Sequence, residues 1–155
     1  MEKTNVIRIL EGHKIPHRVL SYPVDESDLS AVHVAEVLQI PPEQVFKTIV
    51  LVGDRSGPLV CVVPGPYEVD LKKAARASGN KAIDPLPLRE LEGLTGYVRG
   101  GCSPIGMKKL FPTYIEELAL LFDAITVSAG KRGLQVQLAA QDLARLIGAH
   151  FASLV

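Results

Sequence analysis

Residues 45–63 read VFKTIVLVGDRSGPLVCVV, and the architecture of the chain is organised around them. Two runs rich in β-branched residues, Phe46–Val52 and Leu59–Val63, flank the turn residues Gly53–Gly57. β-Branched side chains favour strands, and a short connection that contains Gly and Asp favours a tight reversal of the chain. The sequence therefore predicts an antiparallel β-hairpin here.

Lys47 is the only charged residue in the first of these runs. Because side chains alternate along a strand, we expect Lys47 on the face shared by Ile49 and Leu51, opposite Thr48. An ammonium group in a segment otherwise suited to burial needs a partner, so we expect it to emerge on a concave surface of the sheet. The alternative is a lysine that snorkels to water at the end of the strand.

Helical and extended patterns alternate along the rest of the chain, without a linker or a repeat. They predict one domain spanning residues 1–155, of the α+β (mixed α/β) class, with a mixed, mostly antiparallel sheet and peripheral helices. Helical segments are expected at Val6–Gly12, Ser30–Leu38, Asp70–Gly79, Pro87–Glu92 and Ala140–Ile147, the last closed by Gly148. Further strands are expected at His17–Tyr22, Lys81–Ile83, Gly96–Val98, Ile125–Ser128 and Leu134–Leu138.

The charge balance limits the partners of the chain. Seventeen basic and seventeen acidic residues cancel, which argues against a global positive field that would hold nucleic acid nonspecifically. Two cysteines, one of them in a predicted strand, indicate a reducing compartment, and we expect a cytoplasmic protein. The sequence shows neither a secretory leader nor a membrane span, and the four scattered histidines do not suggest a metal site.

Two glycine-bearing loops carry paired cations. Residues 99–109 read RGGCSPIGMKK, and residues 128–133 read SAGKRG. Glycines let backbone N–H groups approach a carboxylate, a phosphate or a developing oxyanion, and the cations would attract the rest of an anionic substrate. The alternatives are an ordinary glycine turn for the first loop and a solvated hairpin for the second.

Common catalytic motifs are missing from the sequence. It contains no Walker-type phosphate loop, dinucleotide fingerprint or nucleophile elbow. Cys102 and Ser103 have no histidine nearby in sequence to act as a base, so we interpret them as contacts rather than nucleophiles.

Three motifs in register resemble the YbaK/EbsC family of free-standing aminoacyl-tRNA editing proteins, and within it the bacterial Cys-tRNA(Pro) deacylases. These motifs are Val45–Thr48, Gly100–Gly106 followed by Lys108 and Lys109, and Ser128–Leu134. The resemblance implies the editing-domain fold shared with prolyl-tRNA synthetase, a mischarged tRNA(Pro) as substrate, and neither metal nor cofactor. It also suggests prolyl-tRNA synthetase as a partner.

The resemblance further implies roles for individual residues. Lys47 would be catalytic, either by orienting the carbonyl or the terminal ribose or by helping a substrate thiol to ionise. Gln135 departs from the family pattern, because related proteins often have an aspartate there. The implied substrate-binding residues are Tyr22, Gly100, Gly101, Cys102, Ser103, Pro104, Gly106, Ser128, Gly130 and Gln135, and the candidate tRNA contacts are Lys108, Lys109, Lys131 and Arg132.

In the family the thiol of the mischarged cysteine is thought to attack its own ester, which releases a cyclic thioester. Such a site needs orientation rather than a protein nucleophile, and N–H groups near Gly100 and Gly101 would stabilise the oxyanion. Two other hypotheses remain open: a deacylase for Ala- or Ser-tRNA that uses water, and a noncatalytic module that binds tRNA or a synthetase.

Overall fold

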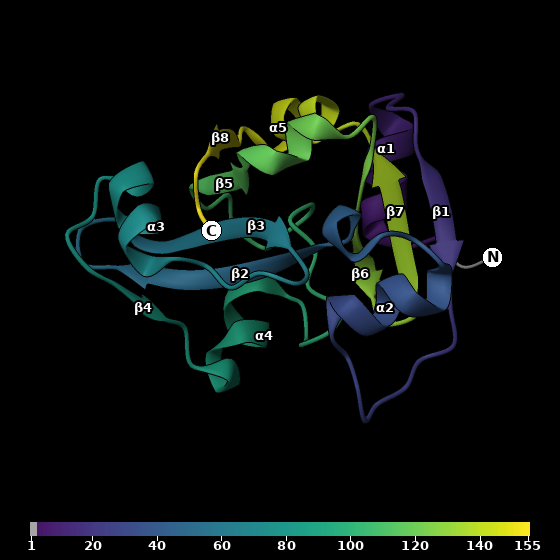
Figure 1. Ribbon diagram of the computed structural model, residues 1–155, viewed down its shortest axis with the longest axis horizontal. Helices are drawn as coiled ribbons and strands as arrows, with labels where there is room; N and C mark the ends of the chain where they lie inside the picture. The colour runs from purple at the N-terminus through teal and green to yellow at the C-terminus, as the bar shows by residue number, and fades with distance from the viewer. Residues whose placement is uncertain (1–2) are drawn as a thin grey trace.

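The computed structural model describes residues 3–155, shown in Figure 1. In chain order its elements are α1 (Asn5–Gly12), β1 (Arg18–Ser21), α2 (Ala31–Leu38), η1 (Pro42–Gln44), β2 (Phe46–Gly53), β3 (Gly57–Pro64), α3 (Leu71–Ser78), β4 (Ile83–Pro85), η2 (Leu88–Glu90), α4 (Leu91–Thr95), β5 (Thr113–Glu116), η3 (Glu117–Leu121), β6 (Ile125–Lys131), β7 (Leu134–Leu138), α5 (Ala140–Ile147) and β8 (His150–Ala152), where η marks a 3-10 helix.

The strands form two sheets, with the orders β1-β7-β6 and β4-β2-β3-β5-β8. Only the β3–β5 and β5–β8 pairings are parallel among the described strands, so the mixed, mostly antiparallel character and the α+β class are confirmed. The strands are divided over two sheets rather than one, and a parallel bridge between Val45 and Thr126 joins them. Pairings between segments this far apart in sequence leave no local pattern, so the sequence did not reveal the division.

The predicted hairpin is confirmed. β2 pairs with β3 along its whole length, from Phe46 opposite Pro64 to Gly53 opposite Gly57. Its two faces enter different parts of the core. Phe46 and Val50 belong to the main hydrophobic cluster, together with α1, β6, β7 and α5. Leu51 belongs to a smaller cluster under α3. The hairpin is therefore buried on both faces, as its continuous apolar sequence predicts.

The helix boundaries follow their capping residues. The hydroxyl of Ser30 accepts a hydrogen bond from the N–H of His33 at the start of α2, and the carboxylate of Asp70 accepts two from the first turn of α3. Gly79 and Gly148 end α3 and α5 in the left-handed conformation, at φ +74° and +66°. These ends were predicted, because the cap residues carry the signal locally.

Some predicted strands were wrong. Residues Gly96–Val98 do not form a strand, because Gly96 adopts φ +87° as the cap of α4. The short strand expected at Lys81–Ile83 lies instead at Ile83–Pro85. The sequence does not predict strands β5 and β8. None of the helices within residues 3–155 is long and apolar enough to cross a membrane.

Candidate active site

A cleft of about 480 Å³ lies alongside β2, where the two sheets meet. Five segments that are far apart in sequence converge on it, and apolar side chains make up most of its wall. The lining residues are Leu29, Ser30, Ala31 and Val34; Val45, Phe46, Lys47, Thr48, Ile49 and Val50; Leu86, Leu88 and Leu91; Arg99, Gly100 and Cys102; and Ser128 and Gln135.

The pairing of β2 explains why the cleft forms at this point. At one end of the strand, Val45 bridges to Thr126 at the start of β6. At the other end, the N–H of Leu86 donates to the C=O of Val50 at 3.3 Å, and β4 pairs with β2 over Leu51–Gly53. Between these contacts the edge of β2 faces the cleft. The site therefore sits in a gap between two strand partners.

Lys47 lines the cleft in company with both glycine loops, as the sequence predicts. Its side chain is 22% exposed, and its Nζ lies 3.4 Å from Oε1 of Glu68, whose side chain is 92% exposed. An ion pair with one partner in water contributes little and exchanges readily. The ammonium is therefore held near the cleft without being locked there. Sequence reasoning required a partner for Lys47 but did not identify Glu68, a solvated residue outside the strand.

The first glycine loop packs against the second at Gly101. A Cβ on the buried Gly101 would lie 3.1 Å from both Arg132 N and Lys131 Cα. The N–H of Gly101 donates to the C=O of Val98 at 3.0 Å, so it is already engaged. This N–H is therefore not free to stabilise an oxyanion. The role of Gly101 is to let the two loops approach each other.

Gly100 is the glycine that faces the cleft. Its φ is +83°, a conformation that other residues rarely adopt, and a Cβ there would lie 3.2 Å from the Cβ of Leu29. The Nε of Arg132 donates to the C=O of Arg99 at 2.9 Å, which ties the second loop to the residue before Gly100. Backbone strain and close packing therefore both favour glycine at this position.

Cys102 lines the cleft, but its electrostatics do not suit a nucleophile. Burial raises the pKa of the Cys102 thiol to about 11, so the thiol stays protonated near neutral pH. The neighbouring Ser103 is fully buried, and its Oγ accepts a hydrogen bond from the N–H of Ile105 at 3.2 Å. These observations agree with the interpretation that neither residue attacks the substrate.

Ser128 and Gln135 face each other across the β6–β7 ladder, and both line the cleft. The Oγ of Ser128 accepts from the N–H of Gly130 at 3.1 Å, where the pairing register shifts between Ser128 and Lys131. The Oε1 of Gln135 is buried and has no hydrogen-bond partner among residues 3–155, and the same holds for the Oγ1 of Thr48. The cleft wall therefore contains two polar atoms whose hydrogen-bonding capacity is unused.

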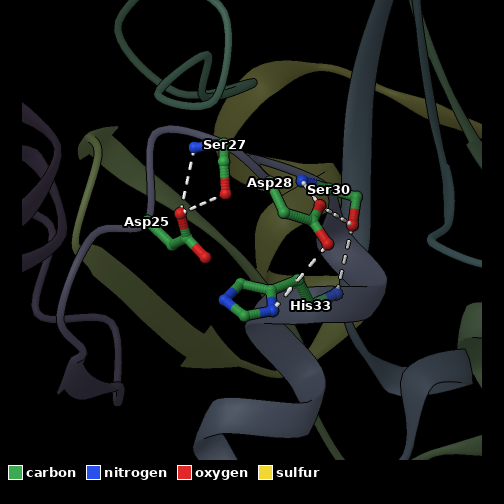
Figure 2. Close-up of polar contacts among 5 residues, drawn as sticks. All are labelled: Asp25, Ser27, Asp28, Ser30 and His33. Atoms are coloured by element: carbon green, nitrogen blue, oxygen red, sulfur yellow. Dashed lines mark hydrogen bonds and ion pairs between the residues drawn. The ribbon is translucent and has the colours of Figure 1, made fainter.

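The segment before α2 carries two carboxylates held by local polar contacts (Figure 2), and its Leu29 and Ser30 line the cleft. Asp25 accepts hydrogen bonds from the hydroxyl and the N–H of Ser27, and Asp28 accepts the same pair from Ser30. These hydrogen bonds, the hydroxyl first, lower the pKa of both carboxyl groups. Nδ1 of His33 lies 3.9 Å from Oδ2 of Asp28. This segment is thus held by local contacts and is acidic, and its Leu29 lies against Gly100, the residue after Arg99.

Several residues that the resemblance placed in the pocket lie elsewhere. Tyr22 packs against the cluster of Val34 and Val45, and it is not among the residues that line the cleft. Gly130 adopts φ +97° and packs against Val6 and Tyr97. Pro104 and Gly106 line a second groove of about 300 Å³ beside α1 and α5. Of the predicted substrate-binding residues, therefore, only Gly100, Cys102, Ser128 and Gln135 line the cleft among the described residues.

The predicted tRNA contacts are also divided. Lys109 lines the second groove, and the Nζ of Lys108 donates to the C=O of Gly93 at 3.4 Å. Lys131 and Arg132 lie next to Gly101, beside the cleft. Sequence reasoning missed the apolar residues of the wall, namely Leu29, Ala31, Val34, Leu86, Leu88 and Leu91. Their only signal was helical or irregular hydrophobic spacing, which does not distinguish a cleft wall from a core.

The two-sheet fold and the cleft built on β2 and two glycine loops can be compared with known proteins. The family model of the aminoacyl-tRNA editing domain matches residues 26–146. A curated relative from Enterococcus faecalis, named "Putative Cys-tRNA(Pro)/Cys-tRNA(Cys) deacylase EbsC", is 52% identical over 99% of this chain and 93% of its own length. The chain therefore belongs to the aminoacyl-tRNA editing domain family, and its resemblance to the YbaK/EbsC proteins is confirmed.

Solved structures agree with this assignment. One, described as a "putative trans-editing enzyme for prolyl tRNA synthetase", is 25% identical, with a TM-score of 0.81 over 99% of this chain and 98% of the other. Another, a hypothetical protein, is 17% identical, with a TM-score of 0.88 over 97% of this chain and 99% of the other, which shows the shared fold.

Proposed function

We propose that this chain is one editing domain, a trans-editing deacylase that clears cysteine from tRNA(Pro) by attack of the substrate's own thiol. The observation that carries the proposal is that Lys47 and Gly100 line one mostly apolar cleft. The name of the 52% identical relative supports the same substrate class. The protonated thiol of Cys102 and the buried hydroxyl of Ser103 support a reaction without a protein nucleophile.

The proposed step balances within the substrate. The cysteine sulfur bonds to the ester carbonyl carbon, and the resulting oxyanion collapses with cleavage of the bond to the ribose oxygen. The thiol proton passes to that oxygen, which leaves as the free tRNA hydroxyl, and the cyclic thioester is then hydrolysed by water. A cleft that holds the sulfur and the carbonyl carbon close together would accelerate such a step.

Lys47 has two roles that suit this chemistry. Its ammonium would stabilise either the thiolate or the carbonyl oxygen as negative charge develops. The N–H groups of Gly100 and Cys102 are the backbone donors that we propose for the oxyanion, since that of Gly101 is bonded to Val98. The apolar wall strengthens these interactions by excluding water.

For the tRNA itself we propose phosphate contacts at Lys131 and Arg132, beside the cleft, rather than at Lys108 and Lys109. Because the chain has no net charge, we expect weak, salt-sensitive binding of tRNA, with prolyl-tRNA synthetase as the partner that supplies selection.

A panel of aminoacyl-tRNAs tests the proposal. We expect the purified protein to release cysteine from tRNA(Pro) and to leave Ala-, Ser- and Pro-tRNA(Pro) intact, because these lack a thiol. Cys-tRNA(Cys) shows whether the tRNA is also selected. The Cys102→Ala variant should retain full activity. Hydrolysis of the substrates without a thiol would instead favour direct water attack, and a tRNA gel shift without any ester cleavage would favour a binding module.

A further inference from the structure

The main chain of Thr48 faces the cleft. Val50 and Val60 are opposite each other in the β2–β3 ladder, yet Val60 N–H donates to Pro112 at 2.9 Å and Val50 C=O accepts from Leu86 at 3.3 Å. This pair therefore directs its N–H and C=O groups away from the ladder. Because these directions alternate along an antiparallel strand, the N–H and C=O of Thr48 also point away from β3.

Thr48 sits in the gap between the two neighbours of the β2 edge. The bridge to Thr126 lies at Val45, and the contact with Leu86 lies at Val50. Thr48 is between these points, and it lines the cleft. Within residues 3–155 no strand forms a ladder with this edge of β2 between Val45 and Leu51, and such an edge is a ready template for another extended group.

The side chain of Thr48 adds to this unused capacity. Its Oγ1 is buried and has no hydrogen-bond partner among residues 3–155. A buried polar group without a partner is costly, and in the wall of a cleft the missing partner is most simply a group of the ligand. The unused side-chain hydroxyl thus belongs to the residue whose main chain points away from β3, beside the cleft.

Building on the proposed function, we infer that Thr48 is the positioning residue for the amino-acid end of the substrate. The α-ammonium donates to the C=O of Thr48 and an ester oxygen accepts from its N–H, as in the addition of a strand. The Thr48 hydroxyl makes a further hydrogen bond to the same ester. These contacts recognise what all aminoacyl esters share, so the apolar wall is left to discriminate between side chains.

Amide hydrogen exchange, measured by NMR, tests the main-chain contact. The probe is 3′-deoxy-3′-(L-cysteinylamino)adenosine, an uncleavable amide analogue of the tRNA terminus. At saturation, the N–H of Thr48 should shift and exchange at least about tenfold more slowly, as a newly hydrogen-bonded amide does. The N–H of Ile49 is the internal control, because it already faces β3 and should not change.

Two isosteric variants test the hydroxyl. Thr48→Val should lower kcat/KM about three- to tenfold, the equivalent of one neutral hydrogen bond, while Thr48→Ser should restore it. Thr113→Val is the matched control: it removes a hydroxyl that donates to Phe111 C=O at 2.9 Å, away from the cleft, and should affect stability alone.

The outcomes separate the two proposals. If the analogue binds and shifts Gly100 but the N–H of Thr48 neither shifts nor gains protection, the inference is overturned while the proposed function stands. Equal activity of the wild type and Thr48→Val would overturn the role of the hydroxyl. If the wild type neither binds the analogue nor deacylates Cys-tRNA(Pro), both proposals fail.

Discussion

Replacing Gly101 by alanine should damage both stability and activity, because the added methyl group would meet backbone atoms. Its Cβ would lie 3.1 Å from Arg132 N and 3.1 Å from Lys131 Cα, and the loops must separate by a few tenths of an ångström. Overpacking of this kind costs about 1–3 kcal/mol, and the lower entropy of the unfolded alanine chain offsets about 0.4–1 kcal/mol of it. We therefore expect a net loss of about 1–2 kcal/mol in the free energy of unfolding.

The same displacement reaches the cleft, since Gly100 and Cys102 flank Gly101 and line the wall. Small errors in the placement of catalytic groups are costly, so we expect single-turnover deacylation to fall about tenfold. Urea unfolding and release of radiolabelled cysteine measure the two effects. The control is Gly93→Ala in α4, whose Cβ would meet nothing within 4 Å. It should gain about 0.5–1 kcal/mol and keep its activity. A Gly101→Ala protein as stable and as active as the wild type would show that the two loops are not packed as described.

Three further predictions concern electrostatics and capping. Burial raises the pKa of Cys61 to about 12 and that of Cys102 to about 11, from 9.0. The free energy of unfolding should therefore hold up to about pH 9 and decline above it, as the unfolded thiols ionise first; urea midpoints that stay constant to pH 11 would contradict this. Asp70→Ala should cost about 1 kcal/mol in thermal or urea unfolding, because its carboxylate caps α3, and Asp70→Asn should cost much less. Glu68→Gln should change kcat/KM by less than about fivefold, since its pair with Lys47 is solvated; a greater loss in deacylation assays would make Glu68 part of the machinery.

Local signals predicted the parts of the fold that depend on neighbouring residues. The β2–β3 hairpin follows from its β-branched runs, and α2 and α3 begin at Ser30 and Asp70 because these side chains cap them. β5 and β8 were missed because their pairing is decided by distant contacts. Glu116 is an example: its buried carboxylate accepts hydrogen bonds from the N–H groups of Leu154 and Val155, an arrangement that no sequence spacing reveals.

The sequence also predicts the candidate site only in part. Lys47 stands out because a cation interrupts an apolar strand, and in the structure it lines the same cleft as Gly100. The resemblance predicts the motif around Gly100 as one pocket-lining unit, but only part of it lines the cleft. Gly101 packs on the second loop, whereas Pro104 and Gly106 turn to another groove. A glycine required by a ligand and one required by a neighbouring loop look alike in sequence.

The Lys47→Met variant tests the central claim most directly, because methionine keeps much of the apolar stem and removes the ammonium. Single-turnover cleavage of Cys-tRNA(Pro) should fall by at least about a hundredfold, as expected when a charge that stabilises the transition state is lost, while the urea midpoint stays close to that of the wild type. Cleavage at the wild-type rate by a folded Lys47→Met protein would contradict the account.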